Sequence, residues 1–240
     1  IAKELRSYFV SPVVYAVGSV FLLTVGLLAY LYVVFAGSQA IQLVQMQGSA
    51  QLNLNDLVFR NLFASTRFIL LIILPILTMR LFAEERKLRT FEFLLTSPIR
   101  INEIVVGKFM GVFLVFLGLL GLTGLMPLTL ALFSDFDWYP VLTGYLGLIL
   151  LGALFLSVGV LASALTENQI VAFILSFLFV VALFLMDKVL MYVPEAFATP
   201  MEFLSIDYHF SNIARGVIDT RDLIYFGSLL GFGLYLATVT

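Results

Sequence analysis

The stretch Ala83–Arg100, AEERKLRTFEFLLTSPIR, is the long polar interruption around which this chain is organised. In a sequence that is otherwise mostly a series of apolar runs, it carries Glu84, Glu85, Arg86, Lys87, Arg89, Glu92 and Arg100. Charge of this density has to lie outside a lipid bilayer. Leu88, Phe91 and Leu95 are spaced i, i+3 and i+7, so a helix here has an apolar stripe opposite its charges. We therefore predict a short surface helix over residues 83–97, between two membrane spans.

Pro98 sets the end of this helix. Proline has no backbone N–H and disfavours helical geometry in the residue before it, so the helix should end by about Thr96 and a new one should start nearby. The alternative interpretation of the segment is a solvated loop that binds no partner.

The composition indicates an integral membrane protein. Of the 240 residues, 62% are hydrophobic and only 12% are charged, and the mean hydropathy is +1.09. An average soluble domain is about half apolar and a quarter charged. The net charge of −2 argues against nucleic acid as a partner, and the absence of cysteine excludes disulfides and thiolate metal sites.

The apolar runs predict an all-α protein, with one transmembrane domain over 1–240 built from six membrane helices. A helix needs about 20 apolar residues to cross a bilayer. The predicted spans are 13–35, 62–82, 103–133, 141–165, 170–193 and 223–240. Residues 1–12 have the mixed pattern of an interfacial helix, although a frayed tail fits as well, and 201–222 should form an amphipathic segment on the outer side.

Basic residues predict the orientation. One side of the membrane collects Lys3, Arg6, Arg80, Arg86, Lys87, Arg89, Arg100 and Lys108, whereas the other has Arg60, Arg67, Lys188, Arg215 and Arg221. The side richer in lysine and arginine is usually cytoplasmic. We therefore expect a multi-pass protein with both termini and the 83–97 helix in the cytoplasm, and we place it in the bacterial inner membrane by the family resemblance described below.

The sequence lacks recognisable catalytic, cofactor-binding or metal-binding motifs. It has no phosphate-binding loop GxxxxGK[ST], no HExxH and no GxSxG. We interpret His209, the only histidine, as a surface or capping residue, because one imidazole rarely makes a metal site. Arg67 and Arg80 lie near the ends of the second span, and we interpret them as anchors that reach the membrane surface.

Several stretches together resemble a known family. EERKLRTFEFLLTSPI, followed by Lys108 at the start of the next span, resembles the intracellular loop of ABC-2-type transporter permeases. The matching positions are Glu85, Arg86, Thr90, Glu92, Leu94, Leu95, Pro98 and Lys108. KELRSYFVSP near the start and SIDYHFSNIARGVIDTRDLIYF near the end are similar to the gliding-motility-associated permeases. Arg89 departs from many relatives, which have glycine before the threonine.

The resemblance implies a non-catalytic subunit of an ATP-driven exporter. Such a permease pairs with a second copy or a related permease. Each one docks its cytoplasmic coupling helix on a separate ATPase subunit, and that subunit binds ATP and magnesium. The residues implied for coupling are Glu84, Glu85, Arg86, Thr90, Phe91, Glu92, Leu94, Leu95, Pro98 and Lys108. An accessory membrane or periplasmic protein and membrane lipids are further possible partners.

Besides an intramembrane enzyme, which the absence of any recognisable catalytic set disfavours, two other classes of function compete with this one. One is a membrane scaffold of an envelope or motility machine. The other is an ATP-independent channel or carrier, which the shortage of ionisable residues within the spans disfavours. A permease of the ABC type should be encoded beside an ATPase, so the gene neighbourhood discriminates among these alternatives.

Overall fold

A computed structural model describes residues 2–45, 54–88, 100–190 and 205–240. In this part of the chain the regular elements are all helices, which confirms the all-α prediction. The elements in chain order are α1 (Ala2–Val10), α2 (Pro12–Gln45), the π-helix η1 (Asn55–Arg60), α3 (Asn61–Thr78), α4 (Ala83–Lys87), α6 (Ile101–Thr123), α7 (Leu125–Leu130), α8 (Trp138–Ala164), α9 (Gln169–Leu190), α11 (Ile206–Ala214) and α12 (Thr220–Val239).

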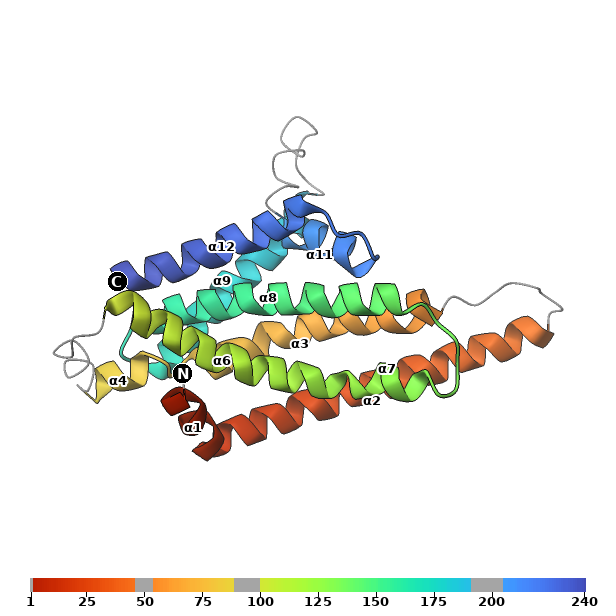
Figure 1. The fold of residues 1–240 in the computed structure, drawn as a ribbon, viewed down its shortest axis with the longest axis horizontal. Helices are drawn as coiled ribbons and strands as arrows, with labels where there is room; N and C mark the ends of the chain where they lie inside the picture. Colours follow the sequence, from red (N-terminus) through yellow and green to blue (C-terminus); the bar gives the residue numbers. More distant parts are fainter. Residues whose placement is uncertain (1, 46–53, 89–99, 191–204) are drawn as a thin grey trace.

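Six helical stretches among the described residues are long and apolar enough to cross a membrane, as the sequence predicts. They are Pro12–Gln42, Asn55–Lys87, Ile101–Leu130, Trp138–Ala164, Gln169–Met186 and Thr220–Val239. Successive long helices run in opposite directions (Figure 1). Two ends of the bundle result. We call the one that carries α1 and α4 the α4 end, and the one that carries η1, α7 and α11 the α11 end.

Helix boundaries differ from the apolar runs in several places. The first long helix continues past Phe35, where its apolar run stops, as far as Gln45. The second begins at Asn55, ahead of the apolar run that starts near Leu62, with a π-helical turn. Hydropathy predicts which residues can lie in lipid, whereas backbone hydrogen bonding continues the helix through residues that have adequate helical propensity.

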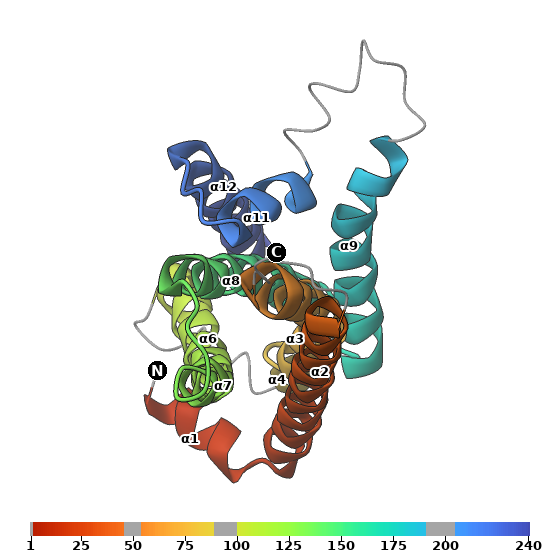
Figure 2. The same ribbon diagram turned by 90° about the vertical axis from the view of Figure 1, so that its right-hand side faces the viewer.

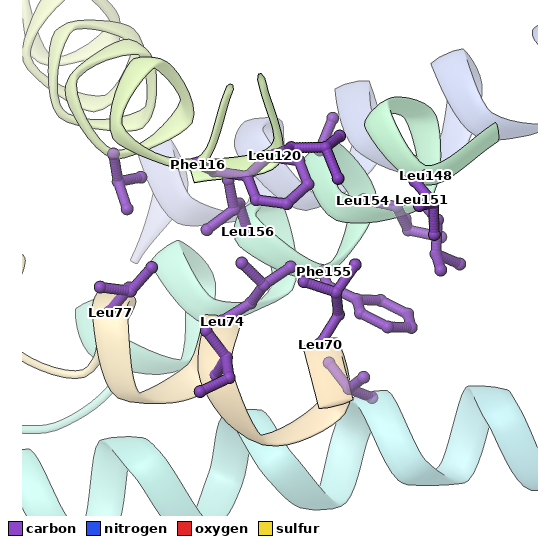
Figure 3. Packing of buried hydrophobic residues seen from close by; sticks show 14 of the residues in the cluster. Leu70, Leu74, Leu77, Phe116, Leu120, Leu148, Leu151, Leu154, Phe155 and Leu156 are labelled. Carbon is purple, nitrogen blue, oxygen red and sulfur yellow. The ribbon is translucent and has the colours of Figure 1, made fainter. Parts of the chain in front are cut away.

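Helix α8 is the centre of the bundle. It packs against α12, α3, α9, α11 and α6, and 72% of its apolar window is buried, against 22% for the windows in α2, α9 and α12. Figure 2 shows α8 between α6 and α3 on one side and α12 on the other. The side chains that meet at this centre include Leu70, Leu74 and Leu77 of α3, Phe116 and Leu120 of α6, and Leu148, Leu151, Leu154, Phe155 and Leu156 of α8 (Figure 3).

Small residues on α8 permit this close packing. A Cβ atom built on Gly144 would lie 2.1 Å from a ring carbon of Phe63, and one on Gly152 would lie 2.3 Å from Phe116. A Cβ on Gly159 would lie 2.1 Å from Oγ1 of Thr78. These distances are far below van der Waals contact, so the glycines let α3 and α6 approach the backbone of α8.

Candidate functional site

The turn between α3 and α4 is held in place by Ser163 of α8. The backbone N–H groups of Phe82 and Ala83 donate to Oγ of Ser163 over 3.0 and 3.2 Å, and this hydroxyl donates to the carbonyl of Met79 over 3.2 Å. Ser163 is fully buried. The first N–H groups of a helix have no partner within the helix. The serine satisfies two such groups and thereby fixes where α4 leaves the bundle.

Lys108 of α6 is buried beneath α4, with only 4% of its surface exposed. Its Nζ donates to the carbonyl of Leu81 over 2.8 Å and to Oε1 of Glu85 over 2.7 Å. Oε1 of Glu4, from α1, lies 3.6 Å from the same nitrogen, and the Phe82 ring centroid lies 5.2 Å from it. A buried ammonium group is costly unless it is paired, so these contacts determine which elements can meet here.

Helix α1 is attached to the same place. A Cβ on Gly111 of α6 would lie 2.8 Å from Cβ of Glu4, so α1 rests directly on the α6 backbone. The hydroxyl of Tyr8 donates to the carbonyl of Leu77 over 3.1 Å. Burial raises the pKa of Tyr8 far above its ordinary value, an effect that nearby Arg80 only partly offsets. The phenol therefore remains a hydrogen-bond donor even in alkaline solution.

The structure brings together four of the ten residues expected to act in coupling. Glu84, Glu85 and Arg86 lie on α4, and Lys108 lies beneath it on α6. Glu84 is exposed, whereas Glu85 and Arg86 are half-buried. Arg86 donates from Nη2 to the carbonyl of Thr240 over 3.2 Å. The remaining six positions lie outside the described residues: Thr90, Phe91, Glu92, Leu94, Leu95 and Pro98.

A second polar cluster lies at the α11 end. Arg67 of α3 is 7% exposed and forms an ion pair with Asp207 of α11. Its guanidinium lies 5.0 Å from the ring centroid of Phe184 and 5.1 Å from that of Phe210. The interpretation of Arg67 as an anchor that extends to the membrane surface is therefore wrong. This side chain is enclosed by protein and joins α3 to α11.

His209 lies on the same helix as Asp207 and faces α12. It is 2% exposed, so its interpretation as a surface residue is also wrong. Its Nδ1 lies 2.5 Å from Oδ1 of Asp222, which is buried as well, and its ring stacks on that of Tyr225 with centroids 4.0 Å apart. The sequence contained one signal for this cluster: ionisable residues inside an apolar span usually face the protein interior and have a partner.

These features define a helical membrane protein with six candidate spans, in which a short charged helix at one end is joined to the ends of α1, α3 and α6. Comparison with protein families places the chain: residues 1–222 match the model described as ABC-2 family transporter protein. The chain belongs to this family of membrane transport components. No curated protein matches the sequence.

Proposed function

We propose that the protein is the membrane-spanning permease subunit of an ATP-binding cassette exporter, and that α4 transmits the movements of a separate ATPase subunit. The family supports the transport role. The observation that carries the coupling role is the buried Lys108 cluster. One ammonium group holds Glu85 of α4, the carbonyl of Leu81 and Glu4 of α1. A force applied to α4 therefore reaches α1, α3 and α6 together.

The energetics of the cluster favour rigid transmission. Removing one partner from a buried ion pair typically costs about 3–5 kcal/mol, because the other charge stays buried without compensation. Movements of α4 that keep the Lys108 contacts are therefore easier than movements that break them. Allosteric coupling requires packed elements that shift between discrete arrangements, and the contacts of Lys108 link such elements.

The remaining parts of the proposal follow from this role. The α4 end faces the cytoplasm of a bacterium, with both termini on that side and the bundle in the inner membrane. The subunit itself is not an enzyme, and ATP with magnesium binds to the partner. A subgroup related to gliding-motility-associated permeases remains our proposal, on the strength of the residues quoted from both ends of the chain.

A second permease completes the transporter in this proposal. The apolar windows of α2, α9 and α12 are only 22% buried, so each of these helices has a broad face outside the bundle. Gly26 of α2 has open space around the position where a Cβ would lie. Exposed small and apolar residues on a membrane helix favour close contact with another helix. The substrate pathway then forms between the two permeases.

A double substitution tests the docking of the ATPase. We expect Phe91→Asp with Leu95→Asp to abolish pull-down of the ATPase encoded beside the permease, because the change removes two positions of the apolar stripe. Insertion and melting temperature should stay near those of the wild type. A matched control is Leu132→Asp with Phe133→Asp, because these side chains are 79% and 86% exposed at the opposite end. Unchanged pull-down in the first variant would contradict the proposal and favour a scaffold or carrier.

A further inference from the structure

A polar cavity of about 290 Å³ lies at the α4 end, between α1, α4 and the first turns of α6. Its walls carry charged groups of both signs, with Arg80 and Lys108 on one hand and Glu4, Glu84 and Glu85 on the other. Ligand pockets in proteins begin at roughly 300 Å³, so the space suits a small polar group rather than a whole lipid or a peptide.

The charged side chains that line this cavity differ in whether they have an oppositely charged partner. Lys108 is engaged by Glu85 and Glu4, as described above. Arg80 donates from Nη1 to Oγ of Ser11 over 2.6 Å and lies over the Tyr8 ring at 5.5 Å, and no acidic side chain among the described residues pairs with it. Glu84 likewise makes no ion pair within the described part of the chain, where the pairs involve other carboxylates. Within the described residues, one cation and one anion thus line the same cavity without ionic partners.

The surroundings of the cavity are apolar and exposed. Val10 is 76% exposed and Leu88 is 64% exposed, and both line the cavity. Phe9, next to Val10 on α1, is 59% exposed. Helix α1 directly precedes a membrane span, and an amphipathic helix in that place can put Phe9 and Val10 where headgroups meet acyl chains. A ligand bound here has a charged part against Arg80 and Glu84 and an apolar part beside Val10.

We propose that this cavity binds the headgroup of an aminophospholipid, with the phosphate on Arg80 and Ser11 and the primary ammonium on Glu84. Arginine has a planar fork of donors that suits phosphate oxygens. A carboxylate distinguishes an ammonium group, which donates hydrogen bonds, from a quaternary amine, which donates none. The Ser7 hydroxyl is exposed on the same wall and is available to the phosphate. This inference does not depend on the ATPase.

Lipid binding to the isolated permease tests the proposal. Native mass spectrometry of the purified chain would be recorded with phosphatidylethanolamine, phosphatidylcholine and phosphatidylglycerol of identical acyl chains. For the wild type we expect one retained phosphatidylethanolamine and at least about tenfold weaker retention of phosphatidylcholine, which corresponds to roughly 1.4 kcal/mol. Equal retention of these two lipids would overturn the assignment.

Two variants separate the two halves of the site. Glu84→Gln should reduce phosphatidylethanolamine binding to the level of phosphatidylcholine without changing the latter, and because Glu84 is exposed this variant should fold. Arg80→Gln should weaken binding of all three lipids. Matched controls are Glu103→Gln and Arg100→Gln, two exposed residues of the same end that do not line the cavity. Identical lipid preference in Glu84→Gln and Glu103→Gln would refute the role of Glu84.

The source of the headgroup is tested with soluble phosphoethanolamine. For a lipid site, we expect phosphoethanolamine to compete with phosphatidylethanolamine only weakly, because the part beside Val10 is missing. Competition at equal concentration would instead show that a soluble phosphoamine is the ligand and that the lipid is not.

Discussion

At the scale of single residues, Lys108 and Arg67 show that the buried charges of this protein join elements that are distant in the sequence. Each lies in or beside an apolar run, and each is enclosed by protein. Lys108 joins α6 to α4 and α1. Arg67 joins α3 to α11. Both residues have aromatic rings next to the cation, which stabilise a charge that has lost water.

Lys108→Met is expected to lower the melting temperature markedly. The substitution removes the ammonium group from the carbonyl of Leu81 and from the carboxylates of Glu85 and Glu4. Because these carboxylates are 28% and 24% exposed, the loss should stay below the about 3–5 kcal/mol that is typical of a fully buried pair. The double variant Lys108→Met with Glu85→Gln should recover part of the stability, because the carboxylate that has lost the Lys108 cation is then replaced by a neutral amide. Coupled transport should stay low in the double variant. Recovery of transport together with stability would mean that Lys108 only supports folding.

Arg67→Met is expected to destabilise the α11 end. Asp207 loses its cationic partner, and the stacking of the guanidinium on Phe184 and Phe210 disappears. The control is Arg60→Met. Arg60 is about half exposed and lies 3.9 Å from Asp56, and exposed pairs of this kind contribute about 1 kcal/mol or less. Thermal unfolding of both variants in the same detergent compares the two pairs. Equal melting temperatures would contradict the role of Arg67.

At the scale of elements, the glycines of α8 make close contacts with other helices of the same chain. A small-residue face on a membrane helix indicates close helix contact, and a contact between two permeases is one way to use it. In the structure, Gly144, Gly152 and Gly159 receive Phe63, Phe116 and Thr78 of the same chain. The glycine face of α8 thus builds the interior of the bundle.

Gly159→Ala is expected to lower the melting temperature. The new methyl group would meet Oγ1 and Cβ of Thr78, which is fully buried on α3. Overpacking of this kind typically costs about 1–3 kcal/mol. Gly118→Ala on α6 is the control, since nothing lies within 4 Å of the added atom. Alanine favours helix formation there. Similar unfolding of both variants would show that α8 relaxes easily.

At the scale of the whole molecule, the protein is expected to depend on a partner for energy. The sequence has no phosphate-binding loop, so we expect the purified chain to show no ATP hydrolysis above background. Addition of the neighbouring ATPase should give hydrolysis that responds to substitutions in α4. The measurement is phosphate release from highly purified protein, with a preparation from an empty vector as control. Hydrolysis by the chain alone would overturn this expectation.

The sequence by itself determined the class of protein and the number of candidate spans. Hydropathy is sufficient for this because a helix needs about 20 apolar residues to cross a bilayer, and such a run is recognisable within one continuous stretch of sequence. The family was also accessible from the residues of the loop that begins at Ala83. The position of Lys108 at the start of a span was visible too, although its partners were not, because Glu4 and Glu85 come from other segments of the chain.

Only the tertiary structure decided the pairing of the buried polar groups. His209 and Asp222 are separated by a turn and the start of a new helix, and Arg67 meets Asp207 from a distant part of the chain. A side chain that snorkels to the surface and one that is buried in an ion pair look the same in a sequence. They differ only in whether another helix covers them, and that depends on how α3, α11 and α12 pack around α8. Local sequence patterns therefore predict the helices, whereas the packing of the helices decides which charged side chains are buried away from solvent.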